Sequence, residues 1–193
     1  EGASGESGDF GMDFGSDNAG QHIFVEDASF LNASEASNQM TVSFWQKNYG
    51  TGNSSSYWMF APGVNGGGRG NQAHVPWGNQ QIYFDTEGCC NGGNERINRN
   101  INQFEDFYDD FYLDWHHYTF VKNGDQKEIW VDGKLFHSGT NREDFSGRFA
   151  SMTIGSATNG GSSSQAVMDD FAVFAVGLSE EQIGELADGG SPL

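Results

Sequence analysis

The stretch that decides the fold is "WHHYTFVKNGDQKEIWVDGKLFHSG", residues Trp115–Gly139. Apolar and polar residues alternate along it, which is the period-2 pattern of half-buried β-strands. Two pairs, Asn123-Gly124 and Asp132-Gly133, interrupt this pattern. Such pairs favour two-residue hairpin turns, because both central residues of the tightest turn adopt positive φ. The stretch therefore predicts three consecutive antiparallel strands in a meander.

Shorter alternating runs lie on both sides of the meander. They are MTVSFWQK at 40–47, SYWMFA at 56–61, QIYFD at 81–85, SMTIGS at 151–156 and DDFAVFAVGL at 169–178. The 28 glycines favour frequent turns between these runs. Together the patterns predict an all-β domain built as a two-sheet antiparallel sandwich.

Only the end of the chain has a helical pattern, in "LSEEQIGELADGG" at 178–190. Ser179 caps the first turn, and Gln182 three residues later completes a capping box. Gly189 is a typical stop signal for a helix. We therefore expect one short C-terminal helix and no other.

The charge balance is strongly acidic, with 27 Asp and Glu against 9 Lys and Arg, a net charge of −18. This composition argues against nucleic acid, whose binding relies on basic side chains, and against anionic membrane surfaces. It favours cations, calcium first, because a hard cation prefers oxygen ligands. Solubility or salt tolerance is the alternative explanation. No apolar run reaches the roughly 20 residues of a membrane span.

The 193 residues are enough for one domain with a real core. The opening "EGASGESG" is typical of an inter-domain linker. We expect a linker at 1–8, a sandwich domain at 9–188 and a tail at 189–193. The chain is interpreted as a module of a longer secreted protein, joined to other domains of the same parent chain.

Two adjacent cysteines, Cys89 and Cys90, lie in the loop "DTEGCCNGGNER". A bridge between neighbours closes almost no loop, so it adds little stability. Neighbouring Cα atoms lie about 3.8 Å apart, closer than the roughly 4.4–6.8 Å of ordinary disulfides. A bond between them needs a contorted peptide, which the surrounding glycines permit. Such a disulfide would be a rigid apolar plate for a sugar ring. Two free thiols and a redox switch are the alternatives.

Several phrases, taken in order, resemble the laminin G-like domains of the concanavalin A-like lectin/glucanase superfamily. They are MTVSFWQK, the Trp-His and Val-Asp-Gly-Lys phrases of the meander, and the Asp-Asp-Phe strand that leads into Leu-Ser-Glu-Glu. With the opening segment at 8–34 they span nearly the whole chain. The middle segment at 73–93 resembles secreted bacterial members. The resemblance implies a jelly-roll sandwich and a secreted or cell-surface location, where disulfides such as Cys89–Cys90 persist.

The superfamily includes glycosidases and lyases, but their motifs are missing. Glycoside hydrolysis needs two carboxylates about 5–10 Å apart, which laminarinase-type members supply from a Glu-x-Asp-x-x-Glu strand. The nearest acidic cluster, at 104–115, has the wrong spacing, and no lyase-type Gln-Ile-His strand is present. No zinc-like His/Cys spacing occurs, so His116 and His117 are expected to be structural. The chain is therefore not expected to be an enzyme.

The resemblance also implies one structural calcium between the N-terminal segment and the last Asp-bearing strand. Carried over, it implicates Asp17 and either Asp169 or Asp170, with backbone carbonyls as further ligands. The alternative is that Asp169 and Asp170 merely cap a strand. A second acidic group would hold another calcium or form a solvated loop: Glu105, Asp106, Asp109 and Asp110.

The proposed ligand site is a rim formed by residues 72–99. Aromatic faces would stack on a sugar ring while amides and a guanidinium bind its hydroxyls. The expected ligand-binding residues are His74, Trp77, Tyr83, Asp85, Cys89, Cys90, Asn91, Asn94, Arg96 and Trp58. Trp45, Trp115 and Trp130 are assigned to the core, and Trp58 has this alternative too. Arg96 and Arg99 would recognise an acidic polysaccharide or neutralise neighbouring carboxylates.

The resulting prediction is a non-catalytic, calcium-containing, lectin-like carbohydrate-binding module. Its parent would be a secreted bacterial adhesin or polysaccharide-degrading enzyme. The alternatives are a protein- or peptide-binding domain and a structural spacer of a large adhesin. Exposed aromatics beside the cysteine loop favour the glycan hypothesis, and a broad exposed apolar patch favours a protein partner.

Overall fold

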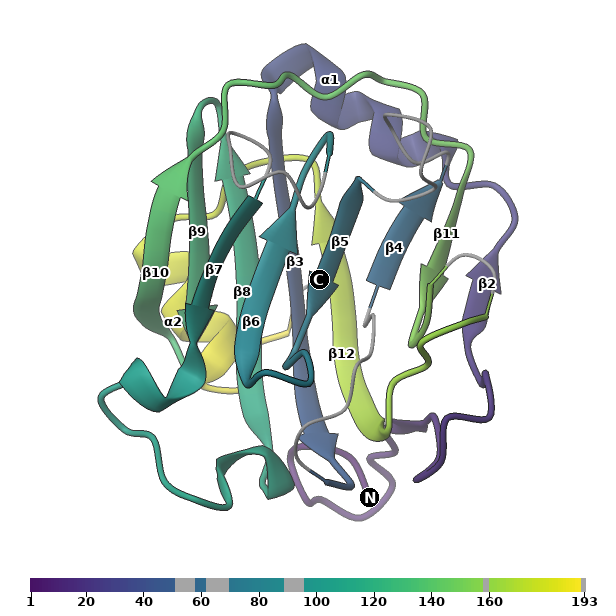
Figure 1. The fold of residues 1–193 in the computed structure, drawn as a ribbon, viewed down its shortest axis with the longest axis vertical. Coiled ribbons are helices and arrows are strands. Elements are labelled where there is room, and N and C mark those ends of the chain that lie inside the picture. Colours follow the sequence, from purple (N-terminus) through teal and green to yellow (C-terminus); the bar gives the residue numbers. More distant parts are fainter. Residues whose placement is uncertain (51–57, 62–69, 89–95, 158–159, 192–193) are drawn as a thin grey trace.

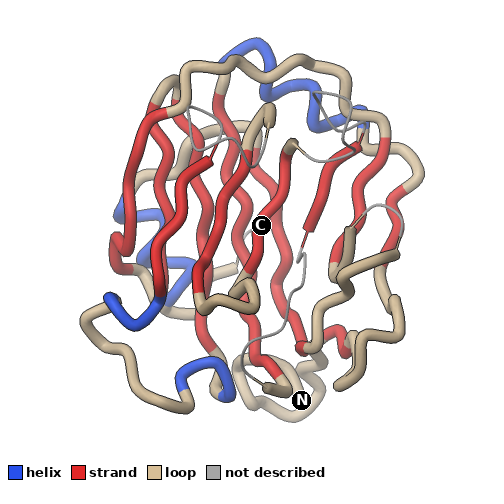
Figure 2. Tube along the Cα trace, in the orientation of Figure 1, coloured by secondary structure: helices blue, strands red, loops and turns tan. Residues whose placement is uncertain are grey.

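The computed structural model describes residues 1–50, 58–61, 70–88, 96–157 and 160–191 (Figure 1). The predicted site residues Cys89, Cys90, Asn91 and Asn94 lie outside these described residues. Two six-stranded antiparallel sheets form the described structure, with short helices at the edges (Figures 1 and 2). The predicted two-sheet, mainly antiparallel architecture with a C-terminal helix is therefore confirmed.

The sheet that contains the meander is called the meander sheet. Its strand order is β1 (Met12–Asp13), β12 (Ala166–Phe174), β3 (Gln39–Asn48), β8 (His116–Asn123), β9 (Gln126–Val131) and β10 (Lys134–Thr140). The other sheet, nearer the viewer in Figure 1, is called the front sheet. Its order is β2 (Ile23–Val25), β11 (Ser151–Ile154), β4 (Trp58–Ala61), β5 (Asn71–His74), β6 (Gln81–Asp85) and β7 (Arg96–Asn100).

The meander forms three strands as predicted, but only one of its turns has the predicted form. Asp132 and Gly133 both adopt positive φ, at 49° and 73°. In the other turn Asn123 pairs with Gln126 across the hairpin, so the central residues are Gly124 and Asp125. Gly124 alone has positive φ, 58°, because the turn begins one residue later than the sequence indicated.

The sequence pattern missed several elements. Strands β5 and β7 read NQAH and RINRN, which contain too few apolar residues for a period-2 signal. Helix α1 (Ala33–Ser37) also contradicts the prediction of a single C-terminal helix. It is five residues long and ends at Asn38, whose left-handed backbone (φ 50°) closes the turn.

Helix α2 (Glu180–Ala187) confirms the predicted capping box. The Ser179 side chain accepts from the Gln182 backbone N–H at 3.4 Å, and the Gln182 side chain accepts from the Ser179 N–H at 2.9 Å. Ile183 is fully buried and packs with Val121 and Trp130 on the outer face of the meander sheet. The helix therefore covers that face.

The core between the sheets is aromatic. Phe120 lies 5.4 Å from Phe84 and 6.1 Å from Trp58, measured between ring centroids, so both sheets contribute. The indole of Trp130 is buried as predicted. Trp45 and Trp115 are only half-buried, against the prediction. Strand alternation explains Trp45, since its neighbour Phe44 takes the inward position.

A buried lysine also joins the sheets. The Lys127 ammonium on β9 lies between them, with no exposed surface, and donates to the Phe84 carbonyl of β6 at 2.8 Å. It also lies 4.1 Å from the centre of the Phe84 ring. This contact fixes the position of β6 against the meander sheet.

Candidate functional site

Strand β6 defines the outer face of the front sheet. Ile82 and Phe84 point into the core and are 0% and 2% exposed. Because successive side chains of a strand alternate in direction, Gln81, Tyr83 and Asp85 point to the outer face. The neighbouring strands β5 and β7 add further side chains beside these three, so the face consists of three neighbouring groups of side chains, called rungs.

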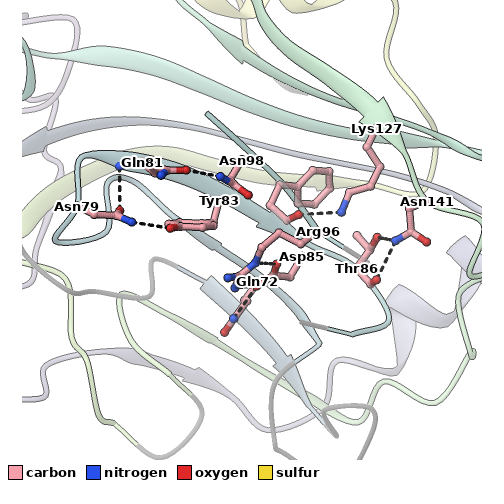
Figure 3. A network of polar contacts seen from close by, with 11 residues as sticks. Gln72, Asn79, Gln81, Tyr83, Asp85, Thr86, Arg96, Asn98, Lys127 and Asn141 are labelled. Carbon is pink, nitrogen blue, oxygen red and sulfur yellow. Dashed lines mark hydrogen bonds and ion pairs between the residues drawn. The ribbon is translucent and has the colours of Figure 1, made fainter. Parts of the chain in front are cut away.

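The first rung is a polar ladder of Gln72, Asp85 and Arg96, one residue from each strand (Figure 3). Asp85 is fully buried and accepts two hydrogen bonds from the Arg96 guanidinium, at 2.5 and 2.7 Å. Gln72 donates to the same carboxylate at 2.8 Å. Burial acts to lower the pKa of Arg96, but the hydrogen bond and charge of Asp85 outweigh it and the pKa is raised. Arg96 therefore stays charged and neutralises Asp85.

The second rung is aromatic. The Arg96 guanidinium lies over the Tyr83 ring, 4.5 Å from its centroid. On its other side Tyr83 meets His74 edge-on at 5.8 Å, and His74 lies 4.7 Å from Trp77. The Tyr83 hydroxyl accepts from the Asn79 side chain at 2.7 Å. Cation, phenol, imidazole and indole thus form one continuous stack.

The third rung consists of amides. The Asn98 side chain donates to the side-chain oxygen of Gln81, Oε1. The Asn79 side chain accepts from the Gln81 backbone N–H at 3.2 Å (Figure 3). Beyond this rung a cavity of 540 Å³ opens at the edge of β7. Its lining residues are Gln81, Asn98, Arg99, Asn100, Gln103 and His137. We call this cavity the edge groove.

The structure brings together five of the predicted ligand residues: His74, Trp77, Tyr83, Asp85 and Arg96. Their exposure differs, because His74 and Asp85 are buried whereas the other three are half-buried. Sequence reasoning missed Gln72, Asn79, Gln81 and Asn98. The polar positions of the QIYFD and RINRN runs were the available signal, because they alternate with buried Ile and Phe.

Trp58 does not belong to this site. Its register partner on β5 is Ala73, which points into the core, and the indole is only 1% exposed. It packs 4.9 Å from Phe60 and 6.1 Å from Phe84. The prediction that Trp58 is a ligand-binding residue is therefore wrong, and its alternative assignment to the core is correct.

The predicted calcium ligands lie at different places. Met12 pairs with Met168 in antiparallel register, so the residues before β1 lie beside Asp169 and the residues after β1 lie at the other end of β12. Asp17 is exposed in that latter region and does not reach Asp169. Asp9 lies close to Asp169 instead, because the side chains of both approach Gly2. Asp9, and not Asp17, is therefore the N-terminal acidic residue that lies beside Asp169.

The Asp9 and Asp169 carboxylates converge at the buried Gly2, where a Cβ would overlap the Oδ2 atoms of both. Asp169 accepts from the Ala3 backbone N–H at 2.8 Å. Asp170 is adjacent, and burial together with the charges of Asp169 and Asp9 raises its pKa. Oxygen donors of this kind fit calcium chemistry. No three His, Cys, Asp or Glu side chains in the described ranges are arranged to hold a metal, so backbone or water oxygens would complete the set.

The acidic segment at 104–115 has a cation partner. Lys134 reaches Asp106 at 2.5 Å and Glu105 at 3.1 Å. The predicted second calcium at Glu105, Asp106, Asp109 and Asp110 thus competes with an ion pair. Asp109 and Asp110 are exposed, as in the alternative of a solvated acidic loop.

His116 and His117 have contacts typical of structural residues. His116 stacks on Phe111 at 3.6 Å and lies 2.7 Å from the Asp132 carboxylate. His117 is 2% exposed on the opposite face of the strand, with its Nε2 2.8 Å from the Ser43 hydroxyl. Burial lowers the pKa of His117 to about 4.

These features define a class: an antiparallel β-sandwich with aromatic and amide side chains on the outer face of one sheet. A laminin G-type family model, described as the concanavalin A-like lectin/glucanases superfamily, matches residues 17–184. The chain belongs to this superfamily. No curated protein matches the chain.

Solved structures with a similar fold include binding domains of botulinum neurotoxins. The receptor-binding domain of mosaic serotype C/D superposes with a TM-score of 0.63 at 16% identity over 89% of this chain and 40% of that one. The binding domain of type DC in complex with rat synaptotagmin II gives 0.61 at 16% identity, over 87% and 40%. Type C, whose cell entry depends on two ganglioside molecules, gives 0.62 at 15%, over 87% and 39%. The likeness shows the fold, and this chain spans about two fifths of those chains.

None of the helices in the described parts of the chain is both long and apolar enough to cross a bilayer.

Proposed function

We propose that this domain is a non-catalytic carbohydrate-binding module, and that the outer face of the front sheet binds the sugar. One observation carries the proposal: the stack of Trp77, His74, Tyr83 and Arg96 is flanked by amide side chains on the same face. Aromatic faces pack against the C–H surface of a sugar ring, and amides both donate to and accept from its hydroxyls.

The stack is held in place before any ligand arrives. Tyr83 is fixed by Asn79, and Arg96 is fixed by two hydrogen bonds to Asp85. Side chains already ordered lose little conformational entropy on binding, which favours affinity for weakly contacted ligands such as sugars.

The same contacts support a non-catalytic role. Asp85 is the single carboxylate among the described outer-face residues of β5, β6 and β7, and Arg96 neutralises it. Glycoside hydrolysis needs a second carboxylate across the cleaved bond. Glu87 is the nearest acidic residue along β6, but it accepts hydrogen bonds from Asn71 and Ser146 instead.

The fold neighbours give independent support for a binding role. Cell entry of botulinum neurotoxin type C depends on interaction with two ganglioside molecules, and the type DC binding domain has been solved in complex with SialylT. The type DC domain has also been solved with a protein, rat synaptotagmin II. A protein partner is therefore the second candidate, favoured by Phe24, which is 55% exposed on the edge strand β2. The parent would be a secreted bacterial adhesin or polysaccharide-degrading enzyme.

The experiment is a glycan-array screen of the domain, followed by calorimetric titration of the strongest ligand. Tyr83→Ala should reduce affinity about tenfold, which corresponds to about 1.4 kcal/mol and lies within the roughly 1–3 kcal/mol that an aromatic ring contributes when a nucleic-acid base stacks on it. Tyr49→Ala is the matched control, because Tyr49 is 48% exposed on another strand end. Absence of binding to any glycan by the folded domain would refute the proposal. A pull-down with the wild-type domain and with Phe24→Ser would then test whether a protein partner binds at this edge strand.

We also propose one calcium ion, held by Asp9 and Asp169 with Asp170 nearby. Ligand binding to the folded state raises stability by about 2.7 kcal/mol when the ligand is at 100 times its Kd. Thermal melting should therefore rise with calcium and fall with chelator, and Asp169→Asn should remove the difference. Asp17→Asn is the control and should keep it. A wild-type melting temperature unaffected by calcium would contradict this site.

A further inference from the structure

We propose that the bound glycan is uncharged and that it extends from the Tyr83 ring into the edge groove. This inference rests on the proposed function and adds the ligand class and the direction of the bound segment. It separates this domain from lectin sites that bind the acidic group of a sugar through a free arginine or lysine.

Two arginines near the site belong to the described part of the chain, Arg96 and Arg99, and both are committed to internal partners. Arg96 is paired with Asp85, and that carboxylate is completely buried. If Arg96 turned to the carboxylate or sulfate of an acidic sugar, it would leave Asp85 charged, buried and unpaired, which is strongly unfavourable. Arg96 is therefore not available to bind acidic ligands.

Arg99 is engaged in a different way. Its Nη1 donates to the Phe136 carbonyl at 2.7 Å and its Nε donates to the Gln103 side chain at 3.0 Å. Its guanidinium also lies 5.4 Å from the centre of the Phe136 ring. These contacts link β7 to β10 beside the edge groove, so Arg99 has a positioning role there.

The remaining basic group of the groove is neutral at pH 7. Burial, and secondarily the charge of Arg99, lowers the pKa of His137 below its usual 6.5. The whole domain carries a net charge of −18, which repels polyanions before they reach the face. The internal pairing of the arginines and the net negative charge of the domain therefore both select against acidic glycans.

The lining of the edge groove suits hydroxyl groups. Four of its six lining residues are amides: Gln81, Asn98, Asn100 and Gln103. Each amide offers two donors and an acceptor, which matches the mixed donor and acceptor character of sugar hydroxyls. The volume of 540 Å³ falls within the roughly 300–1,000 Å³ of small-molecule sites.

The groove is continuous with the aromatic stack. Gln81 lines the groove, and it lies two residues before Tyr83 on the same face of β6. Asn98 is the register partner of Tyr83 and donates to Gln81 (Figure 3). A linear glycan bound against the exposed part of Tyr83 therefore meets the amides of the groove with its next residues.

The test compares neutral oligosaccharides with matched sialylated, sulfated and uronic-acid forms on one array, at about 50 mM and 500 mM NaCl. Neutral forms should bind, and the affinity should be unchanged between the two salt concentrations, because no charge pair is screened. Preferential binding of acidic forms that weakens in high salt would overturn the inference and leave the carbohydrate function standing. No binding to any glycan would instead refute the proposed function itself.

The direction of the bound segment is tested with a length series of the best neutral glycan, from one to six residues. Affinity should rise with length until the groove is filled. Asn98→Ala should weaken the longest ligand by about tenfold and the single sugar by less. Asn102→Ala is the matched control, since Asn102 is exposed beside the groove but is not part of its lining. Equal loss for all lengths, or no gain in affinity with length, would overturn the extension into the groove.

Discussion

The two sheets turn similar aromatic faces toward the core, but their outer faces differ. On the meander sheet, helix α2 lies across the outer face and Ile183 closes over Val121 and Trp130. Figure 1 shows this helix on the side of the meander sheet away from the front sheet. On the outer face of the front sheet, Asp85, Arg96 and Tyr83 form a hydrogen-bonded and stacked array instead.

The comparison teaches how one sandwich separates stability from binding. A helix that buries apolar residues stabilises a face by removing it from water. The front face is stabilised through ion pairing and hydrogen bonding, which leave polar groups on the face where we propose that the glycan binds. Mutations on the two faces should therefore differ in what they damage.

The largest expected effect comes from breaking the ion pair of the front face. Arg96→Ala leaves the Asp85 carboxylate buried and unpaired, and removing one partner of such a pair destabilises by about 3–5 kcal/mol. Urea unfolding measures the loss. Arg148→Ala, on an exposed arginine, should change stability by less than about 0.5 kcal/mol.

A second change in the same protein distinguishes the cause. Adding Asp85→Asn to Arg96→Ala removes the unpaired charge and should recover part of the lost stability. If the double variant were as unstable as Arg96→Ala alone, packing of the arginine, and not the buried charge, would explain the loss.

The next effect tests the covered face. Ile183→Ala truncates the fully buried side chain through which α2 packs on the meander sheet. Such truncations destabilise by about 2–5 kcal/mol. Glycan affinity of the folded fraction should stay at the wild-type value, because the front face is untouched. Leu186→Ala, at a half-buried position of the same helix, should have a smaller effect on urea unfolding. A loss of affinity in Ile183→Ala would contradict the separation of the two faces.

The meander and the C-terminal helix were predictable because local signals specify them. Turn pairs such as Asp132-Gly133 and the capping box at Ser179 act within a few residues of the chain. By contrast, β7 was missed because its sequence RINRN is stabilised by partners on β6, such as Asp85, which are not local.

The site was predictable in composition but not in detail. Tyr83 and Arg96 were chosen for their chemistry, and the structure brings them into contact. Trp58 was misassigned because indole chemistry is the same in a core and on a surface, and only strand register decides between them. Asp9 was missed for the same reason, since its proximity to Asp169 depends on the pairing of β1 with β12.

The smallest expected effect is a pH dependence of stability that comes from His117 on the meander sheet. Burial lowers the pKa of His117 to about 4, partly opposed by the charge of Asp132. The folded pKa therefore lies below the unfolded value of about 6.5, so the unfolded state takes up the proton first as the pH falls. The contribution of His117 to the free energy of unfolding is therefore fully present above about pH 6.5. It decreases as the pH falls toward 4, by at most about 1.4 kcal/mol for each pH unit.

Urea unfolding at pH 7.5, 6.0 and 5.0 measures this dependence in the wild type and in His117→Gln. The variant should lose less stability over this range, since it lacks the group that is protonated on unfolding. His22→Gln, at an exposed position, should keep the wild-type slope. Equal slopes in all three proteins would show that His117 does not control the acid response.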